Sequence, residues 1–209
     1  MELVHQMDNP DLLFRKAEKK DCWKIAELAL IAGEGFPAYF WGLSAKEGQD
    51  ILEIGASNAA SETENFSYRN TVVAEKDGEI IAMLLAYRLP DDENAEDLDE
   101  LPELVRPLVE LEQCVPGSFY INMIATSPES RGMGVGTKLM AIANQMAMDA
   151  SCDLLSIEVF EQNSGALRLY QRLGYQIKES RPVVPHECHP YDSNILLLTR
   201  QVDTDSSFV

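Results

Sequence analysis

The pattern of apolar and polar positions along the chain predicts alternating strands and helices. Strand character, either a period of two or a short apolar run, recurs in these segments: Leu12 to Ala17, Asn70 to Glu75, Glu79 to Arg88, Gly117 to Thr126, Asp153 to Phe160, Tyr175 to Glu179 and Asn194 to Thr199. The second and third segments flank Asp77-Gly78, a dipeptide typical of a hairpin turn. We therefore expect a β-hairpin at that point.

Helical spacing separates these strands. The helix predicted to follow Asp21, its N-cap, ends at Gly33. An aromatic loop is expected at 36–41, and the capping-box pattern from Ser44 to Glu47 predicts a second helix behind it. Two more helices are expected further along the chain: Gly132 to Ala150 and Ser164 to Leu173.

The segment from Asp91 to Glu112 is an acidic insertion with leucines at helical spacing. Two prolines interrupt it, and each is expected to end or kink a helix, so we predict broken helical turns at the surface. No repeat, linker or low-complexity block is visible elsewhere. We expect one domain over 1–209, with its core at about 12–200 and a frayed tail at 202–209.

Charge narrows the classes of partner. The chain has 17 Lys and Arg against 35 Asp and Glu, a formal net charge of −18. Binding to nucleic acid depends on cations that neutralise phosphates, so no nucleic-acid partner is expected. The 45% apolar content is too high for a disordered chain.

The sequence also predicts where the protein works. The start of the chain lacks the basic and apolar stretches of a signal peptide, and the longest uncharged apolar run, Ile80 to Tyr87, is far shorter than the roughly 20 residues that span a bilayer. Four scattered cysteines fit reduced thiols: Cys22, Cys114, Cys152 and Cys188. We expect a cytoplasmic protein with no membrane partner.

The segment Ile124 to Lys138 carries the clearest chemical signal. A strand passes through a turn into a helix that opens with three alternating glycines, Gly132, Gly134 and Gly136. Glycines allow backbone to approach a ligand, and a helix N-terminus attracts anions, so a phosphate or pyrophosphate is the expected ligand. The spacing fits neither a Walker loop nor a dinucleotide fingerprint. A purely structural turn is the alternative.

Here the sequence resembles the GNAT superfamily of N-acyltransferases, whose motif Gln/Arg-x-x-Gly-x-Gly/Ala reads Arg131-x-x-Gly134-x-Gly136. The resemblance implies that the turn binds the pyrophosphate of acetyl-CoA and that the preceding strand binds the pantetheine arm through its backbone. The residues so implicated are Ile124, Ala125, Thr126, Arg131, Gly132, Met133, Gly134, Val135, Gly136 and Thr137.

A second block, from Ile157 to Tyr175, resembles the same family in its order of strand, Asn, helix, Tyr and Leu-Gly-Tyr. The resemblance assigns Asn163 to pantetheine, Tyr170 to general acid catalysis on the thiolate, and Glu158 to the base that deprotonates the amine. Asn163 and Tyr170 are seven residues apart, hence on one helix face. The alternatives are a helix cap for Asn163, a core ring for Tyr170 and a solvated carboxylate for Glu158.

The family implies a GNAT fold, an α/β (α+β) architecture with a mixed, mostly antiparallel sheet opened into a V and flanked by helices. It implies direct transfer of an acetyl group from acetyl-CoA to an amine, without an acyl-enzyme. Two alternatives stay open, a silent acyl-CoA-binding sensor or interaction module, and a transferase for longer acyl groups.

The remaining expectations concern ligands. We expect no metal, because the cluster His186 to His189 lacks a second cluster to complete a zinc site. The negative charge favours a cationic acceptor, with Phe36, Tyr39, Phe40 and Trp41 as a wall for it; solubility alone is the other explanation of the charge. A homodimer is compatible with the sequence.

Overall fold

The computed structural model describes residues 12–92 and 97–204. Its strands are β1 Leu12–Lys16, β2 Thr71–Lys76, β3 Glu79–Arg88, β4 Phe119–Thr126, β5 Leu154–Phe160, β6 Gln176–Pro182 and β7 Asn194–Gln201. Its α-helices are α1 Cys22–Ala32, α2 Phe36–Ser44, α3 Ile51–Ala59, α4 Arg106–Glu112, α5 Val135–Asp149 and α6 Ser164–Arg172. Short 3-10 turns complete the described secondary structure: η1 Lys19–Asp21, η2 Tyr68–Asn70, η3 Leu98–Glu100, η4 Glu103–Val105 and η5 Pro128–Ser130.

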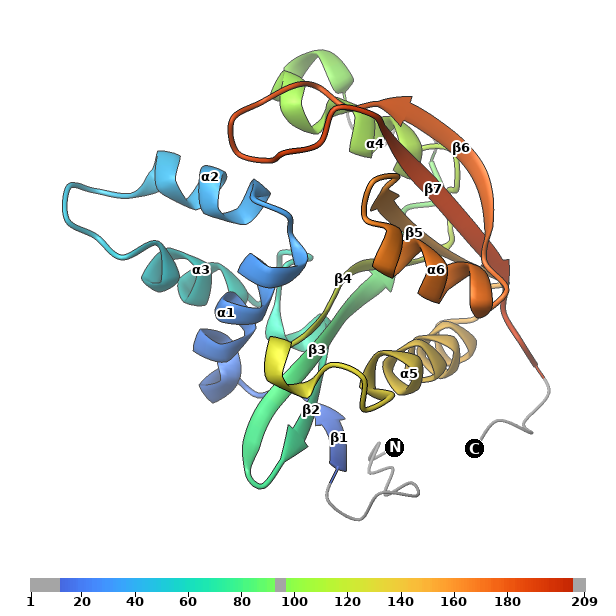
Figure 1. Cartoon of the computed structure of the whole chain (residues 1–209), viewed down its shortest axis with the longest axis horizontal. Helices are drawn as coiled ribbons and strands as arrows, with labels where there is room; N and C mark the ends of the chain where they lie inside the picture. Colours follow the sequence, from blue (N-terminus) through green and yellow to red (C-terminus); the bar gives the residue numbers. More distant parts are fainter. Residues whose placement is uncertain (1–11, 93–96, 205–209) are drawn as a thin grey trace. The chain divides into compact units, whose positions relative to one another are not determined.

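The strands form one mixed sheet in the order β1-β2-β3-β4-β5-β7-β6 (Figure 1). β1 and β2, β2 and β3, β5 and β7, and β6 and β7 pair antiparallel, whereas β4 and β5 pair parallel. The β4–β5 ladder runs only from Phe119↔Leu155 to Ile121↔Ile157, and β5 continues beyond it to Phe160. This open, mostly antiparallel sheet with flanking helices confirms the predicted fold class.

The described contacts divide the chain into two compact units. Unit 1 contains residues 12–86 and Met123–Ala141, and unit 2 contains 87–92, 97–122 and 142–204. The expectation of a single domain stays a prediction.

The β2–β3 hairpin in unit 1 follows its predicted turn (Figure 1). Asp77 and Gly78 both have positive φ, 53° and 81°. Two such residues give the turn the twist that matches two paired strands. The core of unit 1 lies beside this hairpin, where fully buried residues such as Ile25, Val73 and Met83 pack together.

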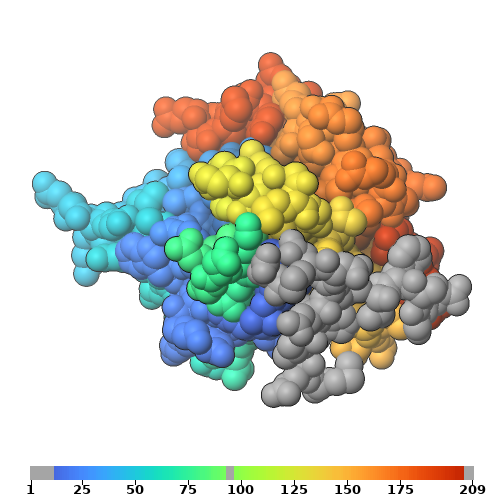
Figure 2. Space-filling model, turned by 60° about the horizontal axis from the view of Figure 1, so that its bottom comes forward, coloured from blue at the N-terminus to red at the C-terminus, as the bar shows by residue number. Residues whose placement is uncertain are grey.

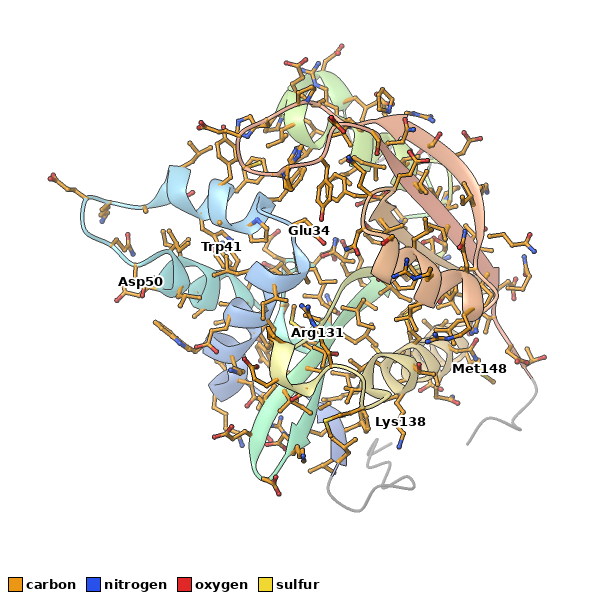
Figure 3. All side chains as sticks on the ribbon, in the orientation of Figure 1. Glu34, Trp41, Asp50, Arg131, Lys138 and Met148 are labelled. Carbon is orange, nitrogen blue, oxygen red and sulfur yellow. The ribbon has the colours of Figure 1, made fainter. Side chains whose placement is uncertain are left out.

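The predicted aromatic loop is wrong, because residues 36–44 form helix α2. Gly35, with φ of 99°, precedes the helix, and Pro37 lies in its first turn, where proline needs no amide partner. The helix is held by packing. The Trp41 ring is 7% exposed and lies so close to Gly55 of α3 that an added Cβ there would come within 2.4 Å of it. Figure 3 shows Trp41 between α2 and α3.

The predicted capping box is also wrong. Ser44 is the last residue of α2, and α3 begins at Ile51. Its N-cap is Asp50, whose Oδ1 accepts a hydrogen bond from the Leu52 amide at 2.9 Å. Asp and Ser are comparable N-cap residues, so both Ser44 and Asp50 were possible starts for this helix. The choice of Asp50 depends on how α3 packs, which the local sequence does not show.

The acidic insertion has the predicted broken turns, η3, η4 and α4, within its described part; residues 93–96 lie outside it. Pro107 neither ends nor kinks α4 but occupies its first turn. Leu104 and Leu111 are buried, so the insertion packs one side inward. The tail predicted at 202–209 is described only to Thr204, and 205–209 lie outside the described residues. In the described ranges, no helix has the length and apolar character needed to cross a membrane.

Candidate active site

The glycine-rich turn in unit 1 lies between β4 and α5. Gly132 and Gly134 have φ of 80° and 79°, a left-handed conformation that L side chains rarely adopt. Among residues 12–92 and 97–204, no atom lies within 4 Å of the place that an added Cβ would take at either position. The glycines are therefore required by backbone conformation, and the space before them is open. In Figure 2 this part of the chain, drawn in yellow, lies at the surface.

The turn presents backbone amides at the start of α5. The first helical hydrogen bond of α5 is donated by the Lys138 amide to the Gly134 carbonyl, at 3.1 Å. Within the described ranges, the amides of Val135, Gly136 and Thr137 have no backbone acceptor. Such amides and the positive end of the helix dipole together attract anions.

Cations accompany these amides. Arg131 is exposed in the turn, and Lys138 is half-buried on α5, with its side chain projecting from the start of the helix (Figure 3). The arrangement suits a pyrophosphate. It brings together all the predicted residues from Arg131 to Thr137, with only Val135 buried as a core contact.

The predicted pantetheine-binding residues form the end of β4. Ala125 is buried in the core of unit 1, and Ile124 and Thr126 are half-buried. The Ser127 amide donates to the Ile81 carbonyl at 2.8 Å, which continues the contact of β4 with β3. Their backbone role with a ligand stays a prediction.

Unit 2 holds the other predicted residues. Asn163 is the N-cap of α6, and its Oδ1 accepts a hydrogen bond from the Ala166 amide at 3.2 Å. Tyr170 is 5% exposed, and its ring centroid lies 6.2 Å from that of Tyr175. The cap is thus present; the catalytic roles of both residues stay predictions.

Glu158 is not a solvated strand carboxylate. Both carboxylate oxygens are buried, and neither reaches hydrogen-bond geometry with any described residue. Burial, and then the negative charge of Glu112, raise the pKa of Glu158 well above its usual range. The nearby Tyr120 hydroxyl acts in the opposite direction but is outweighed. A buried carboxyl group whose pKa is raised holds a proton more readily than a solvated one, which is a common property of groups that transfer protons.

Sequence reasoning missed Tyr120 and Glu112. Tyr120 is 4% exposed, and its pKa is raised by burial and by the charges of Glu158 and Glu112. In the β4–β5 register Tyr120 faces Ser156, so Ser156 and Glu158, two residues apart, point to the same side of the sheet as Tyr120. The parallel register was the missing information, because β4 by itself reads as an ordinary strand.

Comparison with known proteins decides the family. A model of the acetyltransferase (GNAT) family matches residues 47–175, which is more than half of the chain and includes both motifs. The chain belongs to the GNAT acetyltransferase family. The predicted family is confirmed, and the predicted enzyme class, acyltransferase, and cofactor, acetyl-CoA, agree with it.

Individual GNAT relatives match less of the chain. Thialysine N-epsilon-acetyltransferase from Bos taurus is 36% identical over 59 residues, 28% of this chain and 35% of that protein. The match thus spans about a third of the relative's length.

Solved GNAT structures match the fold. A polyamine N-acetyltransferase from Drosophila melanogaster, described as forming N-acetylagmatine, has a TM-score of 0.62 at 17% identity and covers 91% of this chain and 100% of its own. The structure of yncA from Salmonella typhimurium with its cofactor acetyl-CoA has a TM-score of 0.57 at 17% identity, covering 94% and 97%.

Two other groups of residues in this GNAT chain were candidates for chemistry. In the described ranges, no group of three or more His, Cys, Asp and Glu is placed to hold a metal ion. The His189 ring instead packs against Phe160 in a tilted arrangement, with ring centroids 5.5 Å apart. Burial raises the pKa of the Cys22, Cys152 and Cys188 thiols, which disfavours a nucleophilic thiolate.

Proposed function

We propose that the protein is an N-acetyltransferase that moves the acetyl group of acetyl-CoA directly onto an amine in a ternary complex. The observation that carries the proposal is the turn at 131–137, with two left-handed glycines, open space before them and helix-start amides without backbone acceptors in the described chain. Family membership supplies the identity of the anion, the pyrophosphate of acetyl-CoA.

The cofactor roles follow the predicted residues. The amides of the turn and Arg131 bind the pyrophosphate, whose charge they complement. The backbone of Ile124, Ala125 and Thr126 binds pantetheine and polarises the thioester carbonyl. The amide side chain of Asn163 adds a pantetheine contact while its Oδ1 caps α6.

The proton transfers belong to unit 2. Glu158 takes a proton from the acceptor ammonium, which frees the nitrogen lone pair to form the C–N bond as the C–S bond breaks. Tyr170 gives its phenolic proton to the departing thiolate. The nitrogen loses its second proton to solvent as the amide forms, and solvent returns a proton to Tyr170. The burial of both Glu158 oxygens and the upward direction of its pKa shift support a role in proton transfer.

The acceptor is a cationic primary amine. The net charge of −18 attracts cations, and a protonated amine is the species that a buried carboxylate can both hold and deprotonate. Two relatives point the same way by name, since they act on thialysine and form N-acetylagmatine.

The test is Gly134→Asp, compared with Gly48→Asp. Gly134 has a φ of 79° and Gly48 a φ of 76°, and no described residue occupies the place of a Cβ at either position. Both replacements therefore impose a similar backbone strain and add the same charge. Only the first puts a carboxylate before the pyrophosphate site. We expect calorimetry with CoA to show binding lost in Gly134→Asp and kept in Gly48→Asp.

Circular dichroism must show that both variants are folded. Equal CoA affinity in the two variants would contradict the assignment of the turn. Release of CoA from acetyl-CoA in a burst without any amine would contradict direct transfer.

A further inference from the structure

Helix α6 ends in a motif that links Tyr170 to Tyr175. The amide of Gly174, whose φ is 86°, donates to the Gln171 carbonyl at 3.0 Å, and the amide of Tyr175 donates to the Tyr170 carbonyl at 3.1 Å. These two hydrogen bonds define a Schellman motif, in which the side chains at the positions of Tyr170 and Tyr175 usually pack together. Here their ring centroids lie 6.2 Å apart. The place of the Tyr170 ring therefore depends on the place of Tyr175.

Arg200 of β7 holds the end of this motif (Figure 1). Its Nη1 donates to the Leu173 carbonyl at 3.2 Å, and its guanidinium carbon lies 5.2 Å from the centroid of the Tyr175 ring. Its Cδ lies 3.7 Å from the place that an added Cβ would take at Gly174. A cation is favourable both at the C-terminal end of a helix and over a tyrosine ring. One side chain thus lies against three consecutive residues of the turn after α6.

Asn144 of α5 fixes the direction of this guanidinium. Its Oδ1 accepts a hydrogen bond from Arg200 Nη2 at 2.8 Å. The same amide group pairs with the backbone of Asp203, because Oδ1 accepts from the Asp203 amide and Nδ2 donates to the Asp203 carbonyl, both at 2.9 Å. A turn of the Asn144 side chain would break all three bonds. Arg200 is therefore held between α5 and the end of α6.

Stability alone does not account for this arginine. Arg200 Nε and the Tyr175 hydroxyl are both buried, and neither has a hydrogen-bond partner among the described residues. A buried donor without an acceptor destabilises a fold, whereas apolar groups of similar shape would not carry that cost. The two hydrogen bonds that Arg200 does make with Leu173 and Asn144 connect α5 to the turn that places Tyr170.

We propose that Arg200 is a positioning residue for acetyl transfer, which holds Tyr170 through the turn after α6 so that the phenol stays beside the departing thiolate. The role requires no contact of Arg200 with acetyl-CoA or with the amine. It rests on the proposed function, in which Tyr170 is the proton donor, and it deepens that function by adding a residue of β7 that lies outside both family motifs. A small displacement of a reacting group is enough to slow a reaction strongly.

The test is Arg200→Met, which keeps an unbranched side chain and removes the guanidinium. Its matched control is Arg15→Met in unit 1, where Arg15 also joins two partners, Asp21 and Glu75. Both variants should lose stability in thermal unfolding. We expect Arg200→Met to lower kcat about tenfold and to keep its CoA affinity within about twofold, whereas Arg15→Met should keep the kcat of wild type. The readouts are calorimetry with CoA and steady-state kinetics with acetyl-CoA and putrescine, agmatine or lysinamide.

The double variant Arg200→Met with Tyr170→Phe shows whether Arg200 acts through Tyr170. Once the Tyr170 hydroxyl is gone, Arg200 has no proton donor to position, so the double variant should have the same kcat as Tyr170→Phe alone. A merely structural effect of Arg200 would multiply with that of Tyr170→Phe. A double variant about tenfold slower than Tyr170→Phe would therefore overturn the proposal, and so would a wild-type kcat in Arg200→Met.

A spectroscopic readout is independent of turnover. In protein with isotope-labelled tyrosine rings, the Tyr170 signal is the one that disappears in Tyr170→Phe. We expect this signal to shift or broaden in Arg200→Met, because the ring loses its fixed surroundings, and to stay in place in Arg15→Met. An unchanged Tyr170 signal in Arg200→Met would contradict the role of Arg200.

Arg200→Lys covers the case in which Arg200→Met does not fold. Lysine keeps the charge but lacks the planar fork that binds Leu173 and Asn144 in a fixed geometry. We expect its kcat to lie between those of wild type and Tyr170→Phe, again without a further loss when Tyr170→Phe is added. A kcat equal to that of wild type in Arg200→Lys would count against the positioning role.

The failure of this proposal differs from the failure of the proposed function. A wild-type protein that acetylates none of the three amines, or a Tyr170→Phe variant with the kcat of wild type, would refute the function or its proton donor, and the role of Arg200 with it. A slow Tyr170→Phe variant together with an Arg200→Met variant as fast as wild type would refute the role of Arg200 alone.

Discussion

Two carboxylates that lie inside the protein, Asp21 and Glu158, have opposite surroundings. Asp21 in unit 1 accepts hydrogen bonds from Arg15 Nη1 at 2.6 Å and from the Glu18 amide at 2.8 Å. Burial would raise its pKa, but these partners outweigh burial and the pKa is lowered. Glu158 in unit 2 has neither a cation nor a hydrogen-bonding amide in the described chain, and its pKa is raised.

The difference separates a structural carboxylate from a reactive one. Asp21 is the N-cap of α1, but its side chain makes no capping hydrogen bond. It binds Arg15 instead, whose Nε also donates a hydrogen bond to Glu75 Oε2 of β2 at 2.7 Å. The charge of Asp21 therefore stabilises the contact of η1 with β1 and, through Arg15, with β2. Glu158 contributes no such contact, so its presence in a buried strand calls for a chemical explanation.

Glu158→Gln should produce the largest effect of the substitutions considered. The amide cannot accept the proton, so kcat should fall by roughly 10²- to 10⁴-fold. The free energy of unfolding should instead rise in this variant. A raised folded-state pKa means that stability is lost as pH rises through that pKa, and glutamine removes this loss.

The two readouts are steady-state kinetics and thermal unfolding at several pH values. The melting temperature of Glu158→Gln should exceed that of wild type increasingly as the pH is raised, by about 2–4 °C for each kcal/mol gained. A variant that is both active and less stable would place Glu158 with Asp21 as a structural group.

The substitution Tyr170→Phe tests whether Tyr170, a second buried polar residue of unit 2, takes part in the reaction. The change keeps the ring, which is 5% exposed, and removes only the proton donor. We expect kcat to fall by roughly 10²-fold with the affinity for CoA unchanged. An unaltered turnover number at saturating substrates would make Tyr170 a packing residue.

Asp21→Asn should have the reverse profile. Breaking a buried ion pair costs about 3–5 kcal/mol, and we expect about 2–3 kcal/mol here because Arg15 remains 18% exposed. The lowered pKa of Asp21 means that its contribution is present above the unfolded pKa and lost as pH falls through the folded one. Urea unfolding at neutral and at acidic pH should therefore show a difference from wild type that shrinks in acid.

The activity of the folded Asp21→Asn variant should match that of wild type. A loss of kcat without a loss of stability would remove the contrast between the two carboxylates.

The smallest effect concerns pH. A base works in its ionised form, so kcat/KM should fall as the pH drops through the raised pKa of Glu158. Besides burial, the groups that shift the pKa of this carboxyl are Glu112, Tyr120 and Cys114. Glu112→Gln removes a like charge and should move the acidic limb of the profile to lower pH. Glu103→Gln, the same change at an exposed position of η4, should leave the limb in place. An acidic limb at the same pH in both variants would show that Glu112 does not act on Glu158.

Local signals in the sequence were sufficient for many elements. Asp77-Gly78 predicted the hairpin, and Asn163 predicted the start of α6, because turn and cap preferences depend on a few neighbouring residues. Helix α2 was missed because Gly35, Pro37 and Gly42 read as loop residues. Only the burial of Trp41 against α3 makes that segment helical, and such packing cannot be seen in the sequence.

The site residues named from the sequence stay predictions, but the reason why some could be named and others could not is physical. The turn at 131–137 and the residues Glu158, Asn163 and Tyr170 lie in contiguous motifs and could be named. Tyr120 could not, because its relation to Glu158 comes from the β4–β5 register. Glu112 belongs to the acidic insertion, in which the sequence predicted only broken helical turns at the surface.

The position of Glu112 on α4 bears on how such a protein can diversify. The glycine-rich turn joins β4 to α5 and Glu158 lies on β5, whereas Glu112 lies on α4 in the connection between β3 and β4. Mutation, insertion or recombination within this connection can replace one carboxylate and keep the other. A lineage can thus change the charge next to Glu158 by exchanging this connection, while β5 and the glycine-rich turn stay as they are.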